Sequence, residues 1–501
     1  MITRSQVIVV GAGPVGLMLA GELRLGGASV VVLEQRDQPA ADPRASILHA
    51  RTMEILDCRG LLARLGAPPS DAMGHFGGIP LNLTVPGPYP GRWHVLQSHT
   101  EAVLRKWAAS LGASIRPGYR VDQLTQRDTH VEVEATGPDG AVRLQGLYVV
   151  GCDGERSMVR QLAGFELVGE ETGRELLRAF VRGIRIRPRS FDQMPGGLAS
   201  ACRASDGVTK VLVHACDGAA QPRSSSPRFR DVAAAWKQVT GEDISRGTPL
   251  WVSRSGDASR LVTCYRRGRV LLAGDAAHVQ LPLDGQALNL GLQDAANLGW
   301  KLAAHVVGHS SGGLLDSYHT ERHAVAERVL ASLQAQARLL FGGPEAEPVR
   351  AVIARLIELE PVRAHLAGAI SGLDIRYDVG PGQYPLLGMR VPDVSIDATG
   401  PVTITSLLRA GRGVLLDPSG NARHQEQVFR AARRWAGRVD LVPGRLRKDS
   451  ELPGTGALLL RPDGYIAWAG RRPSGLRDAL DRWFGCPVAA PARYAYNRAQ
   501  A

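Results

Sequence analysis

The sequence predicts an α/β protein with a mainly parallel sheet, an inserted antiparallel α+β unit and a small α/β domain at its C-terminal end. The apolar run at residues 6–10 leads into "GAGPVG", a helix and a second apolar run at 29–35, which together form a complete βαβ unit. Strands between 176 and 265 are short or alternate in polarity, whereas "RVLLAGD" at 269–275 is again continuously apolar. Continuous apolar strands are covered on both faces, as in parallel sheets.

The length of 501 residues exceeds what one hydrophobic core supports, so we expect several domains. Residues 1–175 and 266–390 are expected to form the two parts of a discontinuous first domain, with the inserted unit at 176–265 and a C-terminal domain at 391–501. We expect a connector rich in proline and glycine at 343–398, and helices at 17–25, 98–111 (with Thr100 as a possible N-cap), 286–342, 423–436 and 474–484.

Composition excludes several classes of protein. No run of eighteen apolar residues exists, so we expect no transmembrane helix, and a strand beginning after five residues leaves no room for a signal peptide, which predicts a cytoplasmic protein. The six cysteines form no C-x-x-C pair, which argues against a zinc site or a disulfide framework. The net charge of +12 comes almost entirely from arginine and indicates GC-rich coding or attraction of anionic ligands. The sequence contains no basic run with interleaved aromatic residues, so we expect no nucleic-acid binding.

The glycine-rich segment at residues 11–16 fits G-x-G-x-x-G in the required position, after a strand and at the start of a helix. Gly11 makes the tight turn, Gly13 lets the backbone approach a pyrophosphate, and Gly16 allows close helix–strand packing. Glu34 ends the second strand and can accept a hydrogen bond from a ribose hydroxyl. This combination predicts a dinucleotide site; the alternative is a tight packing turn.

Two further acids follow apolar strands far along the chain, Asp153 in "CDGERSMVR" and Asp275 in "AGDAAH". In a parallel sheet both lie on the same edge as the glycine loop, so Asp275 could bond the ribityl chain of a flavin. A helix starting near Gly285 would point its N–H groups at the flavin N1–C2=O region and stabilise negative charge there. The alternative is that both acids are ordinary N-caps.

Together, "GAGPVG", "CDGERSMVR" and "LLAGDAAH" with "GQALNLGLQDAANLGWKL" resemble the three motifs of FAD-dependent aromatic hydroxylases, the class A flavoprotein monooxygenases. The length and the segment "LLLRPDGYIAWAG" are similar to those of actinobacterial hydroxylases that tailor aromatic polyketides. The resemblance covers nearly the whole chain and is weakest in the inserted unit. It implies a Rossmann-like FAD-binding domain of the glutathione-reductase type, an antiparallel substrate domain and a C-terminal thioredoxin-like domain.

The resemblance also implies roles for single residues. Arg44 would lie near the flavin or the visiting nicotinamide cofactor; the alternative is a surface or interdomain salt bridge. Gln97 would touch the ribityl or phosphate region, or cap the following helix. Leu288 and Asn289 would offer backbone N–H groups to the pyrimidine end of the ring. The full set implied to bind the cofactor is Gly11, Gly13, Val15, Gly16, Glu34, Gln35, Arg44, Gln97, Val121, Asp153, Asp275, Pro282, Gly285, Leu288 and Asn289.

The sequence departs from the family pattern next to the expected reaction site. The family reads like H-P-P-A-G-G-Q-G-L-N, whereas this chain reads "QLPLDGQALN" at 280–289. Asp284 therefore replaces a glycine, either as a cap of the following helix or as a base or group that steers the peroxide. With Arg44 and Pro282 it completes the expected catalytic set.

The reaction implied by the resemblance is hydroxylation of an aromatic polyketide of angucycline or anthracycline type in antibiotic biosynthesis. NADPH or NADH would reduce FAD, O2 would add to form a C4a-hydroperoxide, and one oxygen atom would pass to the substrate. A base for the substrate phenol stays open among His49, His278 and Asp284. The alternatives are Baeyer–Villiger or other oxidative rearrangement, and a flavin-binding partner protein without turnover. We expect a monomer or homodimer, and a tail without dithiol chemistry because Cys486 stands alone.

Overall fold

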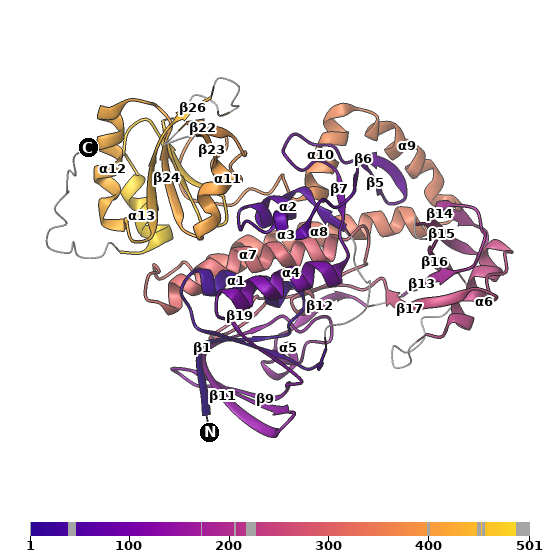
Figure 1. The fold of residues 1–501 in the computed structure, drawn as a ribbon. Helices are drawn as coiled ribbons and strands as arrows, with labels where there is room; N and C mark the ends of the chain where they lie inside the picture. The colour runs from indigo at the N-terminus through magenta and orange to yellow at the C-terminus, as the bar shows by residue number, and fades with distance from the viewer. Residues whose placement is uncertain are drawn as a thin grey trace.

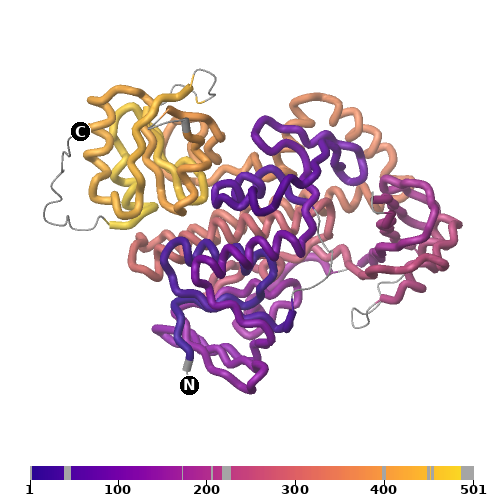
Figure 2. Tube along the Cα trace, viewed as in Figure 1, coloured from indigo at the N-terminus to yellow at the C-terminus, as the bar shows by residue number. Residues whose placement is uncertain are grey.

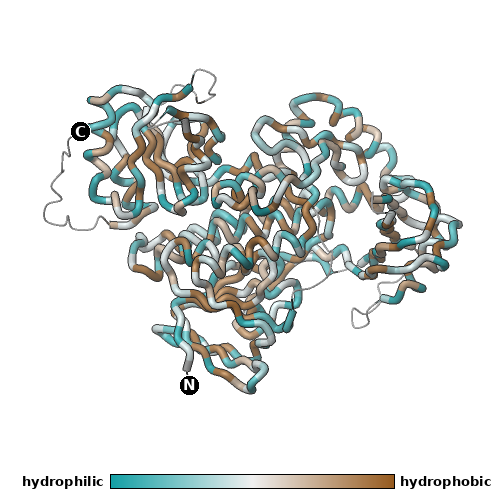
Figure 3. The backbone as a smooth tube through the Cα atoms, in the orientation of Figure 1, coloured by the Kyte–Doolittle hydropathy of each residue, from teal (hydrophilic) through white to brown (hydrophobic). Residues whose placement is uncertain are grey.

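The computed structural model describes residues 2–38, 47–171, 173–204, 207–216, 227–397, 401–447, 452 and 456–486. A central α/β body carries an antiparallel sheet at one end and a small C-terminal domain at the other (Figures 1 and 2). Apolar residues concentrate in the strands of the central body and of the C-terminal domain (Figure 3). Within the described ranges, no helix combines the length and apolarity needed to cross a bilayer.

The main sheet has the parallel core that the sequence predicts, in the order β20-β11-β1-β2-β8. Val7 pairs with Val30 on one side and Tyr148 on the other, and Val149 pairs with Val270. Helices α1 and α4 cover one face together with α7 (Gln286–Val306) (Figure 1). The elements are β1 (Ile2–Val10), α1 (Pro14–Leu25), β2 (Val30–Glu34), α4 (Gln97–Ser110), β8 (Ser114–Pro117), β9 (Arg120–Gln126), β10 (Val131–Gly137), β11 (Gly140–Gly151), α5 (Met158–Leu162), β19 (Arg266–Arg267) and β20 (Val270–Leu272).

The inserted unit is a five-stranded antiparallel sheet in the order β14-β15-β16-β13-β17, as predicted. Helix α6 (Phe229–Thr240) covers one face and buries Trp236 against it. The opposite face meets residues 281–283 and helix α8 through a second apolar cluster. The strands are β13 (Glu175–Arg182), β14 (Arg189–Met194), β15 (Gly197–Arg203), β16 (Thr209–Ala215) and β17 (Thr248–Gly256).

The predicted long helical region is two helices, α7 (Gln286–Val306) and α8 (Ser317–Phe341). In the region predicted as a connector, 343–398, the first half forms helices α9 (Glu347–Ile357) and α10 (Glu360–Ser371). Each has a proline in its first turn, where the missing N–H costs nothing. Short elements connect these parts: β3 (Ile47–His49), α2 (Ala50–Asp57), α3 (Leu62–Leu65), β4 (Ser70–Asp71), β5 (Met73–Phe76), β6 (Ile79–Asn82), β7 (Arg92–His94), β12 (Leu167–Glu170), β18 (Ser259–Val262), η1 (Gly274–Ala276), β21 (His278–Val279) and η2 (Pro344–Ala346).

The C-terminal domain is a mixed sheet, β25-β24-β27-β28, with helices near the predicted positions. All six cysteines of the chain are free thiols, which agrees with the predicted lack of disulfides. The elements are β22 (Ser395–Asp397), β23 (Pro401–Thr403), α11 (Ile404–Leu407), η3 (Leu408–Ala410), β24 (Gly413–Asp417), α12 (Ala422–Ala432), η4 (Arg433–Trp435), β25 (Val439–Pro443), β26 (Arg445–Leu446), β27 (Ala457–Leu460), β28 (Ile466–Gly470) and α13 (Leu476–Phe484).

A fully buried arginine of this domain, Arg461, links it to the body. Arg461 is fully buried, donates to Glu321 of α8 at 2.6 Å, and lies 4.5 Å from the ring centroid of Trp483. Lys301 of α7 also donates to Glu321, at 2.8 Å. Burial alone would raise the pKa of Glu321, but Arg461 and Lys301 together lower it to about 2. The buried carboxylate is therefore held between cations from two domains.

Candidate functional site

Three chain segments meet at one edge of the main sheet, where β1, β11 and β20 end. Gly11 has φ of +102°, and a methyl group there would overlap the carbonyl oxygen of Cys152. A methyl group on Gly274 would lie 3.0 Å from Val15. The glycine loop, the segment after β11 and the segment after β20 are thus in van der Waals contact, and only glycine fits where they touch.

The glycine loop leaves room for a ligand. No atom lies within 4 Å of the position that a Gly13 Cβ would take, whereas a methyl on Gly16 would overlap the carbonyl of Gly11. Gly13 is the N-cap of α1 and supplies no side chain to satisfy the first N–H groups of this helix. Open space in front of unsatisfied helix N–H groups fits a pyrophosphate.

Glu34 lies where an adenosine ribose is expected. Its Oε2 accepts from the Ala12 N–H at 2.8 Å and its Oε1 from the Arg36 N–H at 3.0 Å, so the glycine loop orients the carboxylate. The Tyr119 N–H donates to the Glu34 carbonyl at 2.8 Å, which brings the start of β9, and with it Val121, next to this position. Gln35 is exposed beside Glu34.

Asp275 is exposed between buried residues at 271–274 and 276–280, so it is the side chain that this turn directs outward. It lies inside η1, whose N-cap is Ala273, and the N-cap interpretation of Asp275 is therefore wrong. Behind it, the Asp294 carboxylate accepts from the Gly274 N–H at 3.2 Å and contacts His278 Nε2 at 2.9 Å. The turn is thus braced from the interior.

The Asp153 carboxylate accepts hydrogen bonds from the start of the helix that follows it, α5. It accepts from the Val159 N–H at 3.0 Å and from the Ser157 hydroxyl at 2.5 Å, while Ser157 is the N-cap of α5. Burial raises the pKa of Asp153, and these hydrogen bonds oppose that rise. Its expected contact with the cofactor stays a prediction.

Helix α7 begins beside the turn. Gly285 is its N-cap at φ 75°, and Asn289 anchors the first turn by accepting from the His49 N–H at 2.8 Å and donating to the Ile47 carbonyl at 3.1 Å. The Asn289 N–H donates to the Gly285 carbonyl at 3.3 Å, so a cofactor would have to share it. The N–H groups in the first turn of α7, including that of Leu288, point toward the N-terminal end of the helix.

The helix-cap interpretation of Asp284 is wrong. Its carboxylate caps nothing; Oδ1 instead accepts from Arg92 at 2.7 Å, and Arg92 also binds Asp71 at 2.9 Å. Asp284 has φ of 45°, an unfavourable conformation for a residue with a side chain, and its Oδ2 is buried without a partner. Sequence reasoning missed Arg92, because nothing in β7 shows that it pairs with a residue 192 positions later.

Unpartnered buried polar atoms gather around this loop. They include both side-chain polar atoms of Gln280, Oδ2 of Asp284 and Nε2 of Gln286. Burial lowers the pKa of His49, so its ring is neutral at physiological pH. Buried polar groups are almost always hydrogen-bonded in a functional state, so this cluster fits a bound ligand with several polar atoms, such as the pyrimidine end of a flavin.

Of the remaining expected residues, Gln97 is the first residue of α4 and donates to Glu101 at 2.8 Å. The N-cap is Leu96, so both the cap interpretation of Gln97 and the expected N-cap Thr100 are wrong. Arg44 lies outside the described residues. Pro282 lies in the loop before α7, and its carbonyl accepts from Arg178 of β13 at 2.6 Å, a residue that sequence reasoning also missed.

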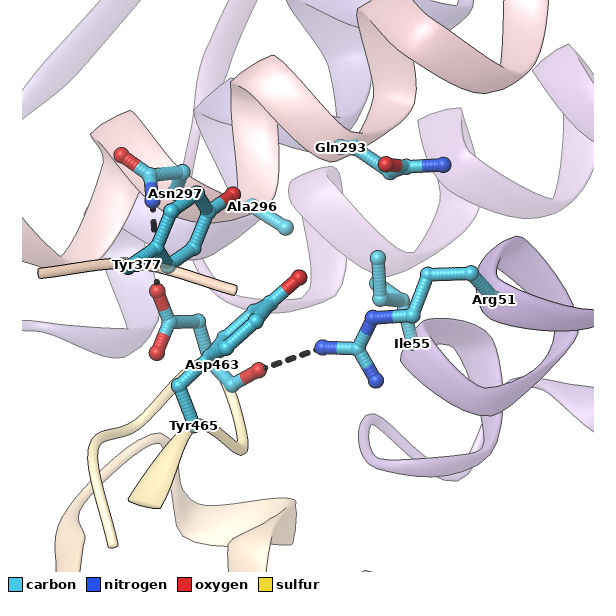
Figure 4. Close-up of a pocket in the computed structure, with 8 residues that line it drawn as sticks. All are labelled: Arg51, Ile55, Gln293, Ala296, Asn297, Tyr377, Asp463 and Tyr465. Carbon is cyan, nitrogen blue, oxygen red and sulfur yellow. Dashed lines mark hydrogen bonds between the residues drawn. The ribbon is translucent and has the colours of Figure 1, made fainter. Parts of the chain in front are cut away.

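A small crevice lies elsewhere, between α2, the middle of α7 and the C-terminal domain (Figure 4). Arg51 donates to the Asp463 carbonyl at 2.7 Å across it, and Asn297 contacts the Asp463 carboxylate at 3.5 Å. Asn297 is twelve residues from Gly285, or about 18 Å along the helix. The crevice therefore belongs to the domain interface and not to the sheet edge.

Comparison with known proteins agrees with this geometry. A family model described as an FAD binding domain matches residues 4–332, and one described as aromatic-ring hydroxylase, C-terminal, matches 384–487. A rifampicin monooxygenase of Streptomyces venezuelae is 39% identical over 97% of this chain and 99% of its own. A 12-dehydrotetracycline 5-monooxygenase/anhydrotetracycline 6-monooxygenase of Streptomyces rimosus is 39% identical over 97% of this chain and 100% of its own. CabE, an aromatic hydroxylase from angucycline biosynthesis, has a TM-score of 0.93 at 48% identity, covering 97% of this chain and 100% of its own.

Proposed function

Because this chain belongs to the FAD-dependent aromatic-ring hydroxylases, we propose that it hydroxylates an aromatic polyketide in antibiotic biosynthesis, with NADPH or NADH as reductant. The chain is a flavin-dependent monooxygenase, so a flavin-binding partner protein without turnover is not retained as an alternative. The observation that supports the cofactor site best is the convergence of three strand ends on one sheet edge.

In this proposal, different residues of the chain bind different parts of the cofactor. The open N-terminus of α1 holds the pyrophosphate, Glu34 the adenosine ribose and Asp275 the ribityl chain. The start of α7 faces the pyrimidine end of the ring, where its N–H groups stabilise negative charge. When bound, FAD supplies the activation of O2 and the transfer of one oxygen atom. The nicotinamide cofactor visits transiently, because the sequence contains one glycine-rich dinucleotide unit.

The substrate lies between the Pro282 loop and the face of the five-stranded sheet opposite α6. Leu281 and Leu283 flank Pro282, are buried in the same apolar cluster as Leu176 of β13, and exclude water from this side. The names of the similar proteins, among them an anhydrotetracycline 6-monooxygenase and an aromatic hydroxylase from angucycline biosynthesis, motivate the substrate class proposed for this chain.

The test is direct. The purified holoprotein is offered NADPH or NADH together with aromatic polyketide intermediates, while oxygen uptake and product mass are measured. A product heavier by one oxygen atom, with its ring skeleton intact, is the expected result. A ring-expanded product would favour the Baeyer–Villiger alternative, and a yellow protein that oxidises neither nicotinamide with any polyketide would overturn the proposal.

A further inference from the structure

Strand β13 runs through the inserted sheet and presents two different faces. Leu177, Ala179 and Val181 lie in the apolar core beneath α6. The alternate residues point to the other face, where Leu176 packs in one cluster with Leu281 and Leu283. Arg178 is the next residue on that face, and it donates to the Pro282 carbonyl at 2.6 Å.

Arg178 is a cation without a counter-ion. Its Nε is inaccessible to solvent and has no hydrogen-bond partner. Burial lowers the pKa of Arg178 to about 10, so the group stays charged at neutral pH, and among the described residues it forms no ion pair with a carboxylate. Two other arginines of this sheet are paired, Arg254 with Glu175 and Arg189 with Glu242 at 2.8 Å.

The surroundings of Arg178 suit a flat aromatic molecule. Ser253 lies directly opposite it on β17, and Phe180 is the next residue on the same face. The Phe180 and Trp251 rings have centroids 5.1 Å apart, and Lys210 Nζ lies 5.3 Å from the Phe180 centroid. Aromatic side chains stack on planar rings, and a second cation adds to the positive potential of this face.

We infer that Arg178 binds an anionic oxygen of the aromatic substrate, an ionised phenol or the enolate of a 1,3-diketone, and holds it beside Pro282. This inference rests on the proposed function and specifies its substrate class. Arg178 is partly buried, and an unpaired charge that is partly shielded from water is unfavourable, so an oxyanion that pairs with the guanidinium is bound in preference to the neutral molecule. The phenol proton passes to solvent. The remaining electron-rich ring is the form that reacts best with an electrophilic oxygen atom.

The experiment uses a hydroxyanthraquinone whose visible spectrum changes when its phenol ionises. The dye is titrated with alkali in the presence of saturating FAD-loaded enzyme, and the midpoint is compared with that of free dye. For the wild type we expect the bound dye to ionise at least tenfold more readily than free dye, and Arg178→Met to abolish this difference. Arg178→Lys keeps the charge and should retain part of it. Arg182→Met removes an exposed arginine of the same strand and should behave as wild type.

Binding gives a second readout. Loss of a hydrogen bond to a charged group should raise the Kd of the ionised dye about 10- to 100-fold in Arg178→Met. The O-methylated dye, which cannot ionise, should bind wild type and variant equally. Equal binding of the ionised dye by both proteins would overturn the inference. Retained flavin absorbance in each variant shows that the protein has folded.

Different results would contradict the anion site at Arg178 and the proposed hydroxylase function. If polyketides are hydroxylated but the dye midpoint does not depend on Arg178, the anion site is wrong and the proposed function stands. If the dye binds as an anion through Arg178 but no polyketide is oxidised, the proposed function fails while the anion site remains.

Discussion

The sheet edge and the loop before α7 differ in how their polar groups are satisfied. At the edge, the carboxylates of Glu34, Asp153 and Asp294 accept from backbone N–H groups of the neighbouring segments. At the loop, Asp284 keeps one buried oxygen unpaired, and Arg178 keeps its charge without a counter-ion. The polar groups at the edge are therefore oriented by the chain itself, whereas several buried polar groups at the loop lack a partner among the described residues.

The most destructive change should be at the edge itself. Gly11 has φ of +102°, and Gly11→Ala places a methyl group against the Cys152 carbonyl. This carbonyl belongs to the backbone and cannot rotate away as a flexible side chain could. We expect a loss of more than about 4 kcal/mol in unfolding free energy, with little holoprotein recovered. Gly27→Ala is the control, because Gly27 also has positive φ, 89°, but nothing lies within 4 Å of its Cβ position. Similar losses in both variants would show that conformation alone, and not contact between the segments, restricts Gly11.

The brace behind the edge should be the next most sensitive. Burial raises the pKa of Asp294, but Arg322 and His278 lower it further, so it lies below the ordinary 3.8. Such a carboxyl stabilises the fold above pH 3.8 and loses this contribution as pH falls below it. Asp294→Asn should cost about 3–5 kcal/mol near neutral pH.

The pH dependence distinguishes the charge from packing. The stability gap between wild type and Asp294→Asn, measured by thermal unfolding with flavin fluorescence, should narrow as the pH falls below about 3.8. A gap of constant size would contradict the ionic role. Asp316→Asn removes an exposed partner of Arg266 and should cost less than about 1 kcal/mol.

A smaller effect is expected at the outward-facing acid. Asp275→Ala should leave the fold intact and raise the Kd for FAD about 10- to 100-fold, because a charged acceptor for the ribityl chain is lost. The Kd of Asp275→Asn for FAD should lie between those of the wild type and Asp275→Ala. Equilibrium dialysis with FAD measures this, and undiminished flavin content in the alanine variant would refute the placement.

The smallest change in stability is expected at the loop. Asp284→Gly removes strain of about 1–3 kcal/mol at φ 45°, which offsets the lost ion pair, while Arg92 keeps Asp71 at 2.9 Å. FAD should stay bound, but the fraction of NAD(P)H oxidation that yields hydroxylated product should fall. Hydrogen peroxide release measures the fraction of NAD(P)H oxidation that yields no hydroxylated product. Asp71→Asn, which removes only the outer carboxylate, should keep the wild-type fraction; identical coupling in Asp284→Gly would leave Asp284 a purely structural role.

The sequence predicted the edge better than the loop, for a physical reason. Gly11, Asp153 and Asp275 each follow an apolar strand, and parallel strands end on a common edge whatever the rest of the chain does. Arg92 and Arg178 bind residues 192 and 104 positions away, and their own short strands show no sign of the partner. Only tertiary packing brings them to the loop, through β7 for Arg92 and through the inserted unit for Arg178.

Helix boundaries failed for a different reason. Proline was taken as a sign of a connector, but Pro348 and Pro361 each lie in the first turn of a helix. Gln97 and Thr100 were both assigned capping roles, but the N-cap position is Leu96, which provides no side-chain cap. Local residue type restricts where a helix can begin without fixing the position, because a cap can be supplied by residues of several kinds.

The placement of Arg461 has a practical consequence for enzyme engineering. The guanidinium of the tail neutralises Glu321 inside a different domain, so truncation near residue 390 would remove one of its two cations and leave it with Lys301 and the Asn297 amide. Chimeras between related hydroxylases should therefore inherit helix α8 and the tail from the same parent.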